Sequence, residues 1–393
     1  MVSLRWPRRR PDVQPPLLSL ALQGGGAHGA YTWGVLDRLL EAGIRIDGIS
    51  GTSAGAMNAA ALAAGHAQGG RQGARRALDK FWHSTAQQAL LSPMRRTPLD
   101  RLLGRWNLDA SPGYHWLSLL GRVFSPYQFN PANLNPLRGI LDTQVDFERL
   151  REESPFRLFV SATNVRTSHV RVFATQEMSV DVLLASSCLP TVFQTVTIDG
   201  EGYWDGGYLA DPPLFPFFYE CRSRDLLVIM VNPLARERIP RNPGEILDRL
   251  NEITFNASLV KELRAILLLR DRIEAEGLED ERWRDMRLHR IHGDEDLVAL
   301  EPSSKLNAEW AYLCHLRDLG RTRTDHWLRR HGADIGVRST FDLSWLLEDS
   351  LKPVGAAPPP DGEAQGTGRG RADGGAGGTR GRGGTGRTGG TGA

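Results

Sequence analysis

LLSLALQGGGAHG, residues 17–29, is the stretch from which the fold is best predicted. Residues 17–23 form a short apolar run that ends at three glycines, and residues 30–42 place apolar side chains on one face of a helix. The order is therefore strand, glycine loop, helix, and backbone N–H groups in such a loop can bind an oxyanion or a phosphate. Gly24-x-Gly26-x-x-Gly29 also fits a dinucleotide-binding fingerprint, for which Asp47 is only a loose match to the acidic residue that ends the second strand.

A second glycine-bounded motif, Gly51-Thr52-Ser53-Ala54-Gly55, follows closely. Residues 44–50 are rich in β-branched side chains and predict a strand, and the alanine-rich residues 54–64 predict a helix. Ser53 would then stand on a tight turn from strand to helix, where the helix N-terminus favours negative charge on its oxygen. Gly-x-Ser-x-Gly alone is weak evidence, and a serine cap without chemistry is the alternative. Because such a serine has no role in a dinucleotide site, the two motifs together favour an acyl-transfer site.

An acyl-transfer serine needs a base that accepts its proton. A Ser-His-Asp enzyme would use a later histidine, but none lies in a glycine-flanked or turn-like setting: His169, His289, His292, His315, His326 and His331. A carboxylate within hydrogen-bond reach can accept the proton directly. Asp205, in Gly202-Tyr203-Trp204-Asp205-Gly206-Gly207-Tyr208, is the best candidate, because two glycines after an aspartate indicate backbone that passes close to another group. An ordinary Asp-Gly turn is the alternative.

Together these motifs resemble those of the patatin-like phospholipases, in their bacterial form. The resemblance rests on residues 24–29, 51–55 and 205–207, and on residues 185–193 (ASSCLPTVF), which precede the aspartate. It spans about residues 17–235, over half of the chain. It implies an α/β protein with the three-layer α/β/α patatin-like fold and a mostly parallel central sheet.

The resemblance also implies the roles of the site residues. Ser53 and Asp205 would form a catalytic dyad without histidine. The oxyanion hole would be formed by Gly24, Gly25, Gly26, Ala27, His28 and Gly29, the nucleophile elbow by Gly51, Thr52, Ala54 and Gly55, and the aspartate motif by Gly206 and Gly207. The family usually has Arg or Lys where His28 stands, and a histidine contributes positive charge only when it is protonated.

The function that the resemblance implies is a serine lipid acyl hydrolase, either of the phospholipase A type or a broader lipid esterase. Asp205 would accept the proton of Ser53, Ser53 would attack an ester carbonyl, and water would release the acid from an acyl-enzyme. The mechanism requires neither a metal nor a cofactor, and the expected partner is a lipid or phospholipid substrate. A Ser-His-Asp esterase or thioesterase and a non-catalytic lipid-binding protein are the alternatives.

Composition restricts the other classes of protein. The chain has 393 residues and a formal net charge of +2, which gives no general attraction to nucleic acid. Its three cysteines, Cys188, Cys221 and Cys314, are far apart, which fits a reducing compartment and argues against a disulfide scaffold or a zinc site. No stretch approaches the roughly 20 apolar residues of a membrane span. We expect a cytoplasmic protein that binds peripherally to membranes and has no nucleic-acid partner; the sequence does not predict its oligomeric state.

The chain divides into three parts by composition. Residues 1–15 predict a basic flexible leader, because the apolar run that follows is too short for a signal peptide. Residues 16–350 predict the patatin-like acyl hydrolase domain, with core strands at 157–162, 170–174 and 226–231 and with a mainly helical part over 240–350. Residues 353–393 form a Pro/Gly/Arg-rich tail that cannot bury apolar surface and is expected to be disordered. Gly-Arg tails also bind nucleic acid, but this one has no aromatic residue, so a solvated tail is favoured.

Residues 84–140 differ from the rest of the domain, because aromatic residues and arginines alternate there and prolines and asparagines mark the end. This pattern is typical of a cap or lid insertion that touches a lipid surface. An ordinary packed insertion is the alternative.

Overall fold

The computed structural model describes residues 16–90, 92–236, 239–241, 243–277, 286–298, 300–343 and 346. The described residues all belong to one compact unit, Met1–Pro353. The predicted leader, residues 1–15, and the predicted tail, residues 353–393, lie outside the described residues.

A single mixed sheet of eight strands forms the centre of this unit, in the order β5-β6-β3-β2-β1-β7-β8, with β4 paired to β3. The strands are β1 (Leu17–Leu22), β2 (Arg45–Gly51), β3 (Arg157–Asn164), β4 (Val170–Ala174), β5 (Val196–Ile198), β6 (Glu201–Asp205), β7 (Asp225–Met230) and β8 (Arg287–His292). Strands β3, β2, β1, β7 and β8 pair with one another in parallel. The pairs β3–β4, β3–β6 and β5–β6 are antiparallel. The predicted mostly parallel sheet is confirmed.

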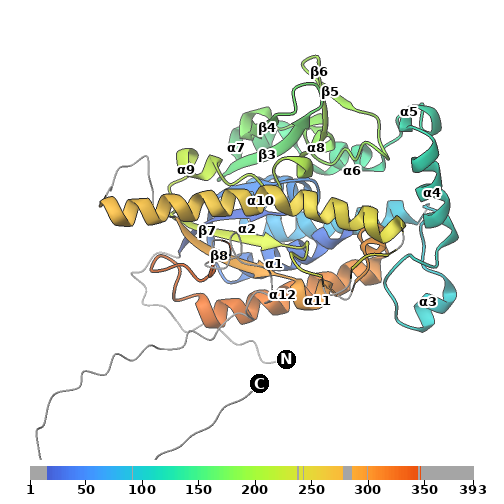
Figure 1. The fold of residues 1–393 in the computed structure, drawn as a ribbon. Coiled ribbons are helices and arrows are strands. Elements are labelled where there is room, and N and C mark those ends of the chain that lie inside the picture. The colour runs from blue at the N-terminus through green and yellow to red at the C-terminus, as the bar shows by residue number, and fades with distance from the viewer. Residues whose placement is uncertain are drawn as a thin grey trace, which may run out of the picture. The chain divides into compact units, whose positions relative to one another are not determined.

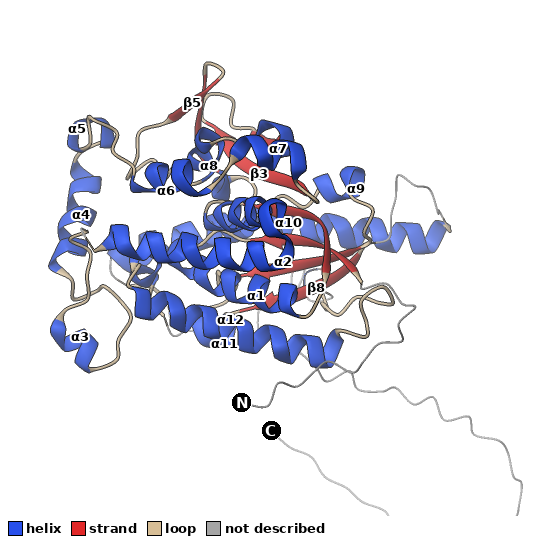
Figure 2. Cartoon of the chain, turned by 180° about the vertical axis from the view of Figure 1, so that it is seen from behind, coloured by secondary structure: helices blue, strands red, loops and turns tan. Residues whose placement is uncertain are grey.

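Helices cover both faces of the sheet (Figures 1 and 2). The α-helices are α1 (Gly29–Glu41), α2 (Ala54–Ala89), α3 (Pro98–Leu102), α4 (Pro112–Val123), α5 (Pro126–Phe129), α6 (Pro136–Gln144), α7 (Phe147–Glu153), α8 (Val180–Ser186), α9 (Pro216–Glu220), α10 (Pro243–Glu276), α11 (Asp294–Leu297) and α12 (Trp310–His331). The short 3-10 helices are η1 (Gly26–His28), η2 (Thr175–Glu177), η3 (Gly206–Tyr208) and η4 (Pro302–Leu306).

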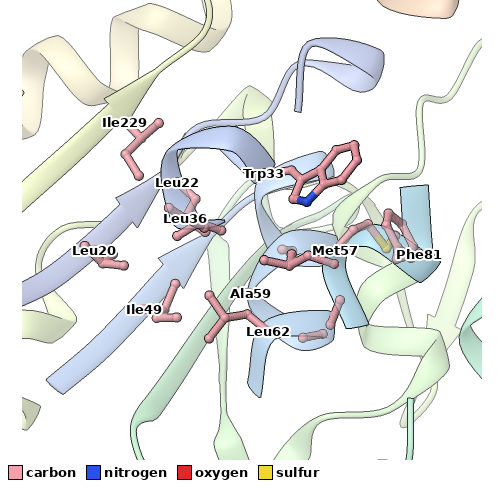
Figure 3. Close-up of a cluster of buried hydrophobic side chains, with 14 of the residues drawn as sticks. Leu20, Leu22, Trp33, Leu36, Ile49, Met57, Ala59, Leu62, Phe81 and Ile229 are labelled. Carbon is pink, nitrogen blue, oxygen red and sulfur yellow. The ribbon is translucent and has the colours of Figure 1, made fainter. Parts of the chain in front are cut away.

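Two apolar cores, one on each face, hold these layers together. On one face, side chains of β1, β2 and β7 pack against α1 and α2 (Figure 3). On the other face, Ala21 of β1, Phe159 of β3 and Val228 of β7 pack with α9 and α10. Successive side chains of one strand therefore point alternately into the two cores, as the two-residue period of a strand requires. The predicted three-layer α/β/α arrangement is confirmed.

Helices α1 and α12 pack closely against each other at two glycines. A Cβ added to Gly34 of α1 would lie 1.9 Å from the carbonyl oxygen of Arg317, and one added to Gly320 of α12 would lie 2.1 Å from the carbonyl oxygen of Tyr31. Only glycine allows backbones to approach this closely. Helix α1 begins directly after the glycine loop, so this contact fixes the base of that loop.

The structure differs from the sequence-based expectation in several elements. The predicted helix 54–64 continues to Ala89, and non-helical backbone at Gly69 and Gly70 interrupts it. Strand β4, predicted as a core strand, has only Phe173 buried, because it pairs with β3 alone at the side of the sheet. Strand β8 was not predicted, and it lies among the helices α10, α11 and α12 of residues 240–350. Residues 84–140, for which only a cap or lid insertion was predicted, contain the short helices α3, α4 and α5.

Candidate active site

The nucleophile elbow forms where β2 meets α2. Ser53 has φ 52° and ψ −120°, a conformation that is strained for a residue with a side chain. A Cβ on Gly51 would lie 2.7 Å from the backbone nitrogen of Ala56, and one on Gly55 would lie 2.2 Å from the carbonyl oxygen of Leu22. The two glycines therefore make this sharp turn possible, and the half-buried Ser53 stands at its tip.

The glycine loop lies beside the elbow because β1 and β2 are adjacent parallel strands, with Leu22 opposite Gly51. A Cβ on Gly24 would lie 3.1 Å from the Cβ of Ser53. Gly26 has φ +58°, and a Cβ there would lie 2.5 Å from the carbonyl oxygen of Lys305. The loop thus runs past the serine with no side chain between them. The N–H groups of Gly24, His28 and Gly29 already donate to Asp211 and to the carbonyl oxygens of Gly25 and Gly26, so the predicted oxyanion hole is reduced to the N–H groups between Gly25 and Ala27.

Asp205 ends β6 and is almost completely buried. Its Oδ1 atom accepts a hydrogen bond of 2.8 Å from the N–H of Gly207. Burial raises the pKa of Asp205 to about 7, although the N–H of Gly207 and the nearby hydroxyl of Ser53 oppose this shift. The structure thus brings together a serine and an aspartate that are far apart in the sequence.

His28 is buried behind the glycine loop and does not supply charge to it. Its Nε2 atom lies 2.8 Å from Ser304 Oγ, so the two share a hydrogen bond. Burial, together with the positive charges of Lys305 and Arg236, lowers the pKa of His28 to about 3. The imidazole is therefore neutral at physiological pH, unlike the Arg or Lys that the family usually has at this position.

The later histidines lie elsewhere. His289 is within 3.0 Å of Asp225 at the start of β7, at the end of the sheet opposite to Ser53, and His331 is within 3.3 Å of Asp334. His315 stacks on Trp106, and His169 and His326 are exposed. His292 lies 3.0 Å from Asp294.

Four further residues support the site: Ser186, which lies in the 185–193 motif without having been assigned a role, and three that sequence analysis missed. Ser186 Oγ accepts a hydrogen bond of 2.9 Å from the N–H of Ser53. Asp211 Oδ1 accepts one of 2.6 Å from the N–H of Gly24, and Asn232 Nδ2 donates one of 2.7 Å to the carbonyl oxygen of Gly24. The fourth, Lys305, donates a hydrogen bond of 2.8 Å to Asn232 Oδ1.

The site carries a mixed set of buried charges. Burial raises the pKa of Asp211 well above its usual range, and the N–H of Gly24 opposes this shift. Burial also lowers the pKa of Lys305, whereas Glu252, 3.6 Å away, raises it. No group of three or more His, Cys, Asp or Glu side chains that could hold a metal ion occurs among the described residues. In the same part of the chain, no helix has the length and apolar character needed to cross a bilayer.

Comparison with known proteins gives a family match and several distant structural neighbours. Residues 20–218 match the family model described as patatin-like phospholipase. No curated protein matches the sequence. VipD from Legionella pneumophila is 15% identical, with a TM-score of 0.41, over 81% of this chain and 68% of that one. The type III effector protein ExoU is 16% identical, with a TM-score of 0.30, over 80% of this chain and 53% of that one. ExoU in its complex with SpcU, from Pseudomonas aeruginosa, is 20% identical, with a TM-score of 0.26, over 82% and 61%.

Proposed function

Because this chain belongs to the patatin-like phospholipase family, and is on that ground a hydrolase of lipid esters, we propose that Ser53 and Asp205 carry out its reaction as a dyad. The observation that carries the proposal is that Ser53 lies close enough to the buried carboxylate of Asp205 to lower its pKa, beside a glycine loop that passes Ser53 without an intervening side chain. A nucleophile, its base and a set of backbone donors are the parts that acyl transfer requires.

The reaction follows from these positions. Asp205 accepts the hydroxyl proton as Ser53 Oγ attacks the ester carbonyl, and the carbonyl oxygen becomes an oxyanion. Backbone N–H groups between Gly25 and Ala27 stabilise that oxyanion, and one such donor contributes about 3 kcal/mol. The proton on Asp205 passes to the departing alcohol, which leaves an acyl-enzyme on Ser53. Water then attacks the acyl-enzyme, Asp205 accepts its proton, and Ser53 leaves with that proton while the fatty acid is released.

The raised pKa of Asp205 suits this role. A base with a pKa near the working pH is ionised often enough to react and is still basic enough to hold the proton of a hydroxyl. The value of about 7 places Asp205 in that range, whereas an exposed aspartate would be a much weaker base.

We assign peripheral membrane contact to residues 92–135, called here the apolar arm. Exposed apolar side chains cover this segment: Leu99, Leu102, Leu103, Trp116, Leu119, Val123, Phe124, Tyr127 and Leu134. Four exposed arginines accompany them, at positions 95, 101, 105 and 122. Aromatic and aliphatic side chains beside arginines are suited to the headgroup region of an anionic phospholipid bilayer.

The apolar arm contacts a loop that leads to the site. A Cβ on Gly121 of α4 would be 3.1 Å from the carbonyl oxygen of Thr191, and the Oη of Tyr127 accepts a hydrogen bond of 3.3 Å from the N–H of Thr195. The loop that carries Thr191 and Thr195 begins just after Ser186, which binds the backbone of Ser53. A bilayer against this arm would therefore present its lipids close to the nucleophile.

Hydrolysis of p-nitrophenyl butyrate and of phosphatidylglycerol vesicles by the wild type, Ser53→Ala and Asp205→Asn tests the dyad. We expect both variants to keep their circular dichroism spectrum and to lose activity by at least about 1,000-fold. Asp142→Asn, which changes an exposed carboxylate, is the matched control and should retain full activity. Loss in Ser53→Ala alone would point to a histidine base and would contradict the dyad.

Binding to phosphatidylglycerol vesicles tests the apolar arm. Trp116→Ser combined with Phe124→Ser should weaken vesicle binding by about tenfold and leave hydrolysis of the soluble ester unchanged, because two membrane-facing side chains are removed. Tyr219→Ser, which removes an aromatic ring that is 78% exposed on α9, is the control. Unchanged vesicle binding by the folded double variant would contradict membrane contact through this arm.

A further inference from the structure

The peptide groups of Gly24 are held on both sides by buried side chains. Its N–H donates to Asp211, and its carbonyl oxygen accepts from Asn232 Nδ2 at 2.7 Å. Asn232 is completely buried just after β7, and its own backbone N–H donates to Gln23 Oε1 at 2.9 Å. The backbone of Asn232 is therefore fixed independently of its side chain.

Lys305 fixes the orientation of the Asn232 amide. Its Nζ atom donates to Asn232 Oδ1 at 2.8 Å, and an ammonium group can only donate hydrogen bonds. The oxygen of the amide must then face Lys305, and the NH₂ group must face Gly24. Glu252, which also binds Arg236 and Arg249, lies 3.6 Å from Nζ and keeps this cation in place.

The carbonyl of Gly24 determines where the next N–H points. In a trans peptide the C=O of one residue and the N–H of the next point in opposite directions. Asn232 follows β7, and Ser53 follows β2, on the other side of β1 in the sheet order β2-β1-β7. Because Asn232 holds the Gly24 carbonyl on the β7 side, the N–H of Gly25 is turned toward the β2 side, where Ser53 stands.

The positive charge of Lys305 also polarises the groups along this chain of hydrogen bonds. A cation that binds Asn232 Oδ1 makes the NH₂ group a stronger donor, and a carbonyl that accepts a stronger bond makes its peptide N–H more acidic. His28 is neutral, so Lys305 provides a positive charge behind the loop from a segment more than 270 residues further along the chain.

We propose that Asn232 and Lys305 are positioning residues for the oxyanion loop: Asn232 aims the Gly25 N–H at the site by holding the Gly24 carbonyl, and Lys305 orients and polarises Asn232. This inference rests on the proposed function of Ser53. It assigns no contact between either side chain and the substrate.

Three variants test the proposal. Asn232→Asp keeps the shape of the side chain and removes the NH₂ donor to Gly24, whereas Lys305→Met keeps the length and removes the charge. Asn232→Ala combined with Lys305→Met tests whether Lys305 acts through Asn232. Lys80→Met, on the exposed side of α2, is the matched control for the loss of a lysine.

Steady-state hydrolysis of p-nitrophenyl butyrate and inhibition by a trifluoromethyl ketone, which forms an oxyanion adduct with a catalytic serine, give the readouts. We expect kcat to fall about 30-fold or more in Asn232→Asp and about tenfold in Lys305→Met, with KM changed less than about threefold. The affinity for the ketone should fall in parallel with kcat, because both depend on the oxyanion donors. Lys305→Met should add less than about threefold to the effect of Asn232→Ala, because a shared pathway makes the two losses non-additive.

The outcomes separate this inference from the proposed function. Wild-type activity that survives Ser53→Ala would overturn both. Activity that requires Ser53 but keeps its kcat in folded Asn232→Asp and Lys305→Met would overturn the positioning role alone. A loss confined to KM, or a loss of kcat without a parallel loss of ketone affinity, would also overturn it. If Asn232→Asp does not fold, Lys305→Met decides the question by the same two readouts.

Discussion

Replacement of Asp205 with asparagine should stabilise the folded protein while it removes activity. The pKa of this carboxyl group is about 7 in the folded protein, against 3.8 for an unperturbed aspartate, because burial penalises the charged form. The folded state therefore binds the proton more tightly than the unfolded chain does. The free energy of unfolding consequently falls as the pH rises from about 4 through 7, and the asparagine variant escapes this loss.

The size of the effect follows from the shift in pKa. Each pKa unit corresponds to about 1.4 kcal/mol, so a shift of roughly three units costs the wild type about 4 kcal/mol at pH 8. About 3 kcal/mol of that cost develops between pH 5 and pH 8. The stability advantage of Asp205→Asn over the wild type should therefore grow by about 3 kcal/mol across this interval.

Urea unfolding followed by circular dichroism at pH 5 and pH 8 measures this growth directly. Asp109→Asn, which changes an exposed carboxylate, supplies the baseline for a neutralised aspartate. An Asp205→Asn advantage that is equal at the two pH values, or larger at pH 5, would refute the claim that Asp205 is held as a buried, weakly acidic group. That result would also remove the basis for its action as a base near neutral pH.

Three further effects follow from the geometry of the site. Log kcat/KM for the soluble ester should rise with a slope of about one below pH 7 and level off above it, as a pH–rate profile can measure, because the proposed base must be ionised; a flat profile between pH 5 and 8 would contradict this assignment. Gly26→Ala should reduce activity at least about 100-fold, because its Cβ would lie 2.5 Å from a backbone carbonyl oxygen of η4. The matched control is Gly104→Ala, since Gly104 has a similar φ of +66° but open space around it. Equal losses of activity in the two variants would refute the argument. Ser186→Ala should lower kcat about tenfold by releasing the N–H of Ser53, whereas Ser187→Ala, whose hydroxyl bonds only its own helix, should not; identical rates would show that Ser53 needs no such support.

The sequence was sufficient to predict the part of the site built from neighbouring elements. Residues 17–64 contain two strands, two helices and the two glycine motifs in one continuous run, and their local signals agree with one another. Adjacent parallel strands then bring the loop and the elbow to the same edge of the sheet. Local pattern and a simple rule of sheet geometry thus suffice for this half of the site.

The supporting side chains could not be predicted in the same way. Asn232 contacts Gly24, and Lys305 contacts Asn232, only because β7 lies beside β1 and because η4 packs against the glycine loop. Asn232 stands alone after an apolar strand, and Lys305 lies in a 3-10 turn without periodicity. Neither position differs locally from an ordinary loop residue.

Strand β8 was missed for a different reason. Its sequence, RLHRIH, contains two arginines and two histidines, and the apolar signal of a buried strand is correspondingly weak. Arg287 and His289 are accommodated because both bind the buried carboxylate of Asp225 on β7. An ion pair with a neighbouring strand thus replaces the apolar run that the prediction relied on.

The contact between α1 and α12 makes the two halves of the chain mechanically inseparable. The family match ends at residue 218, yet α12, residues 310–331, lies against the helix that begins at the glycine loop. With backbone against backbone at Gly34 and Gly320, neither helix can slide without moving the other. A fragment cut at the end of the family match would contain the proposed serine and aspartate but would lack the support that holds the loop in register with them. The smallest working unit of this enzyme is therefore larger than the segment by which its family is identified.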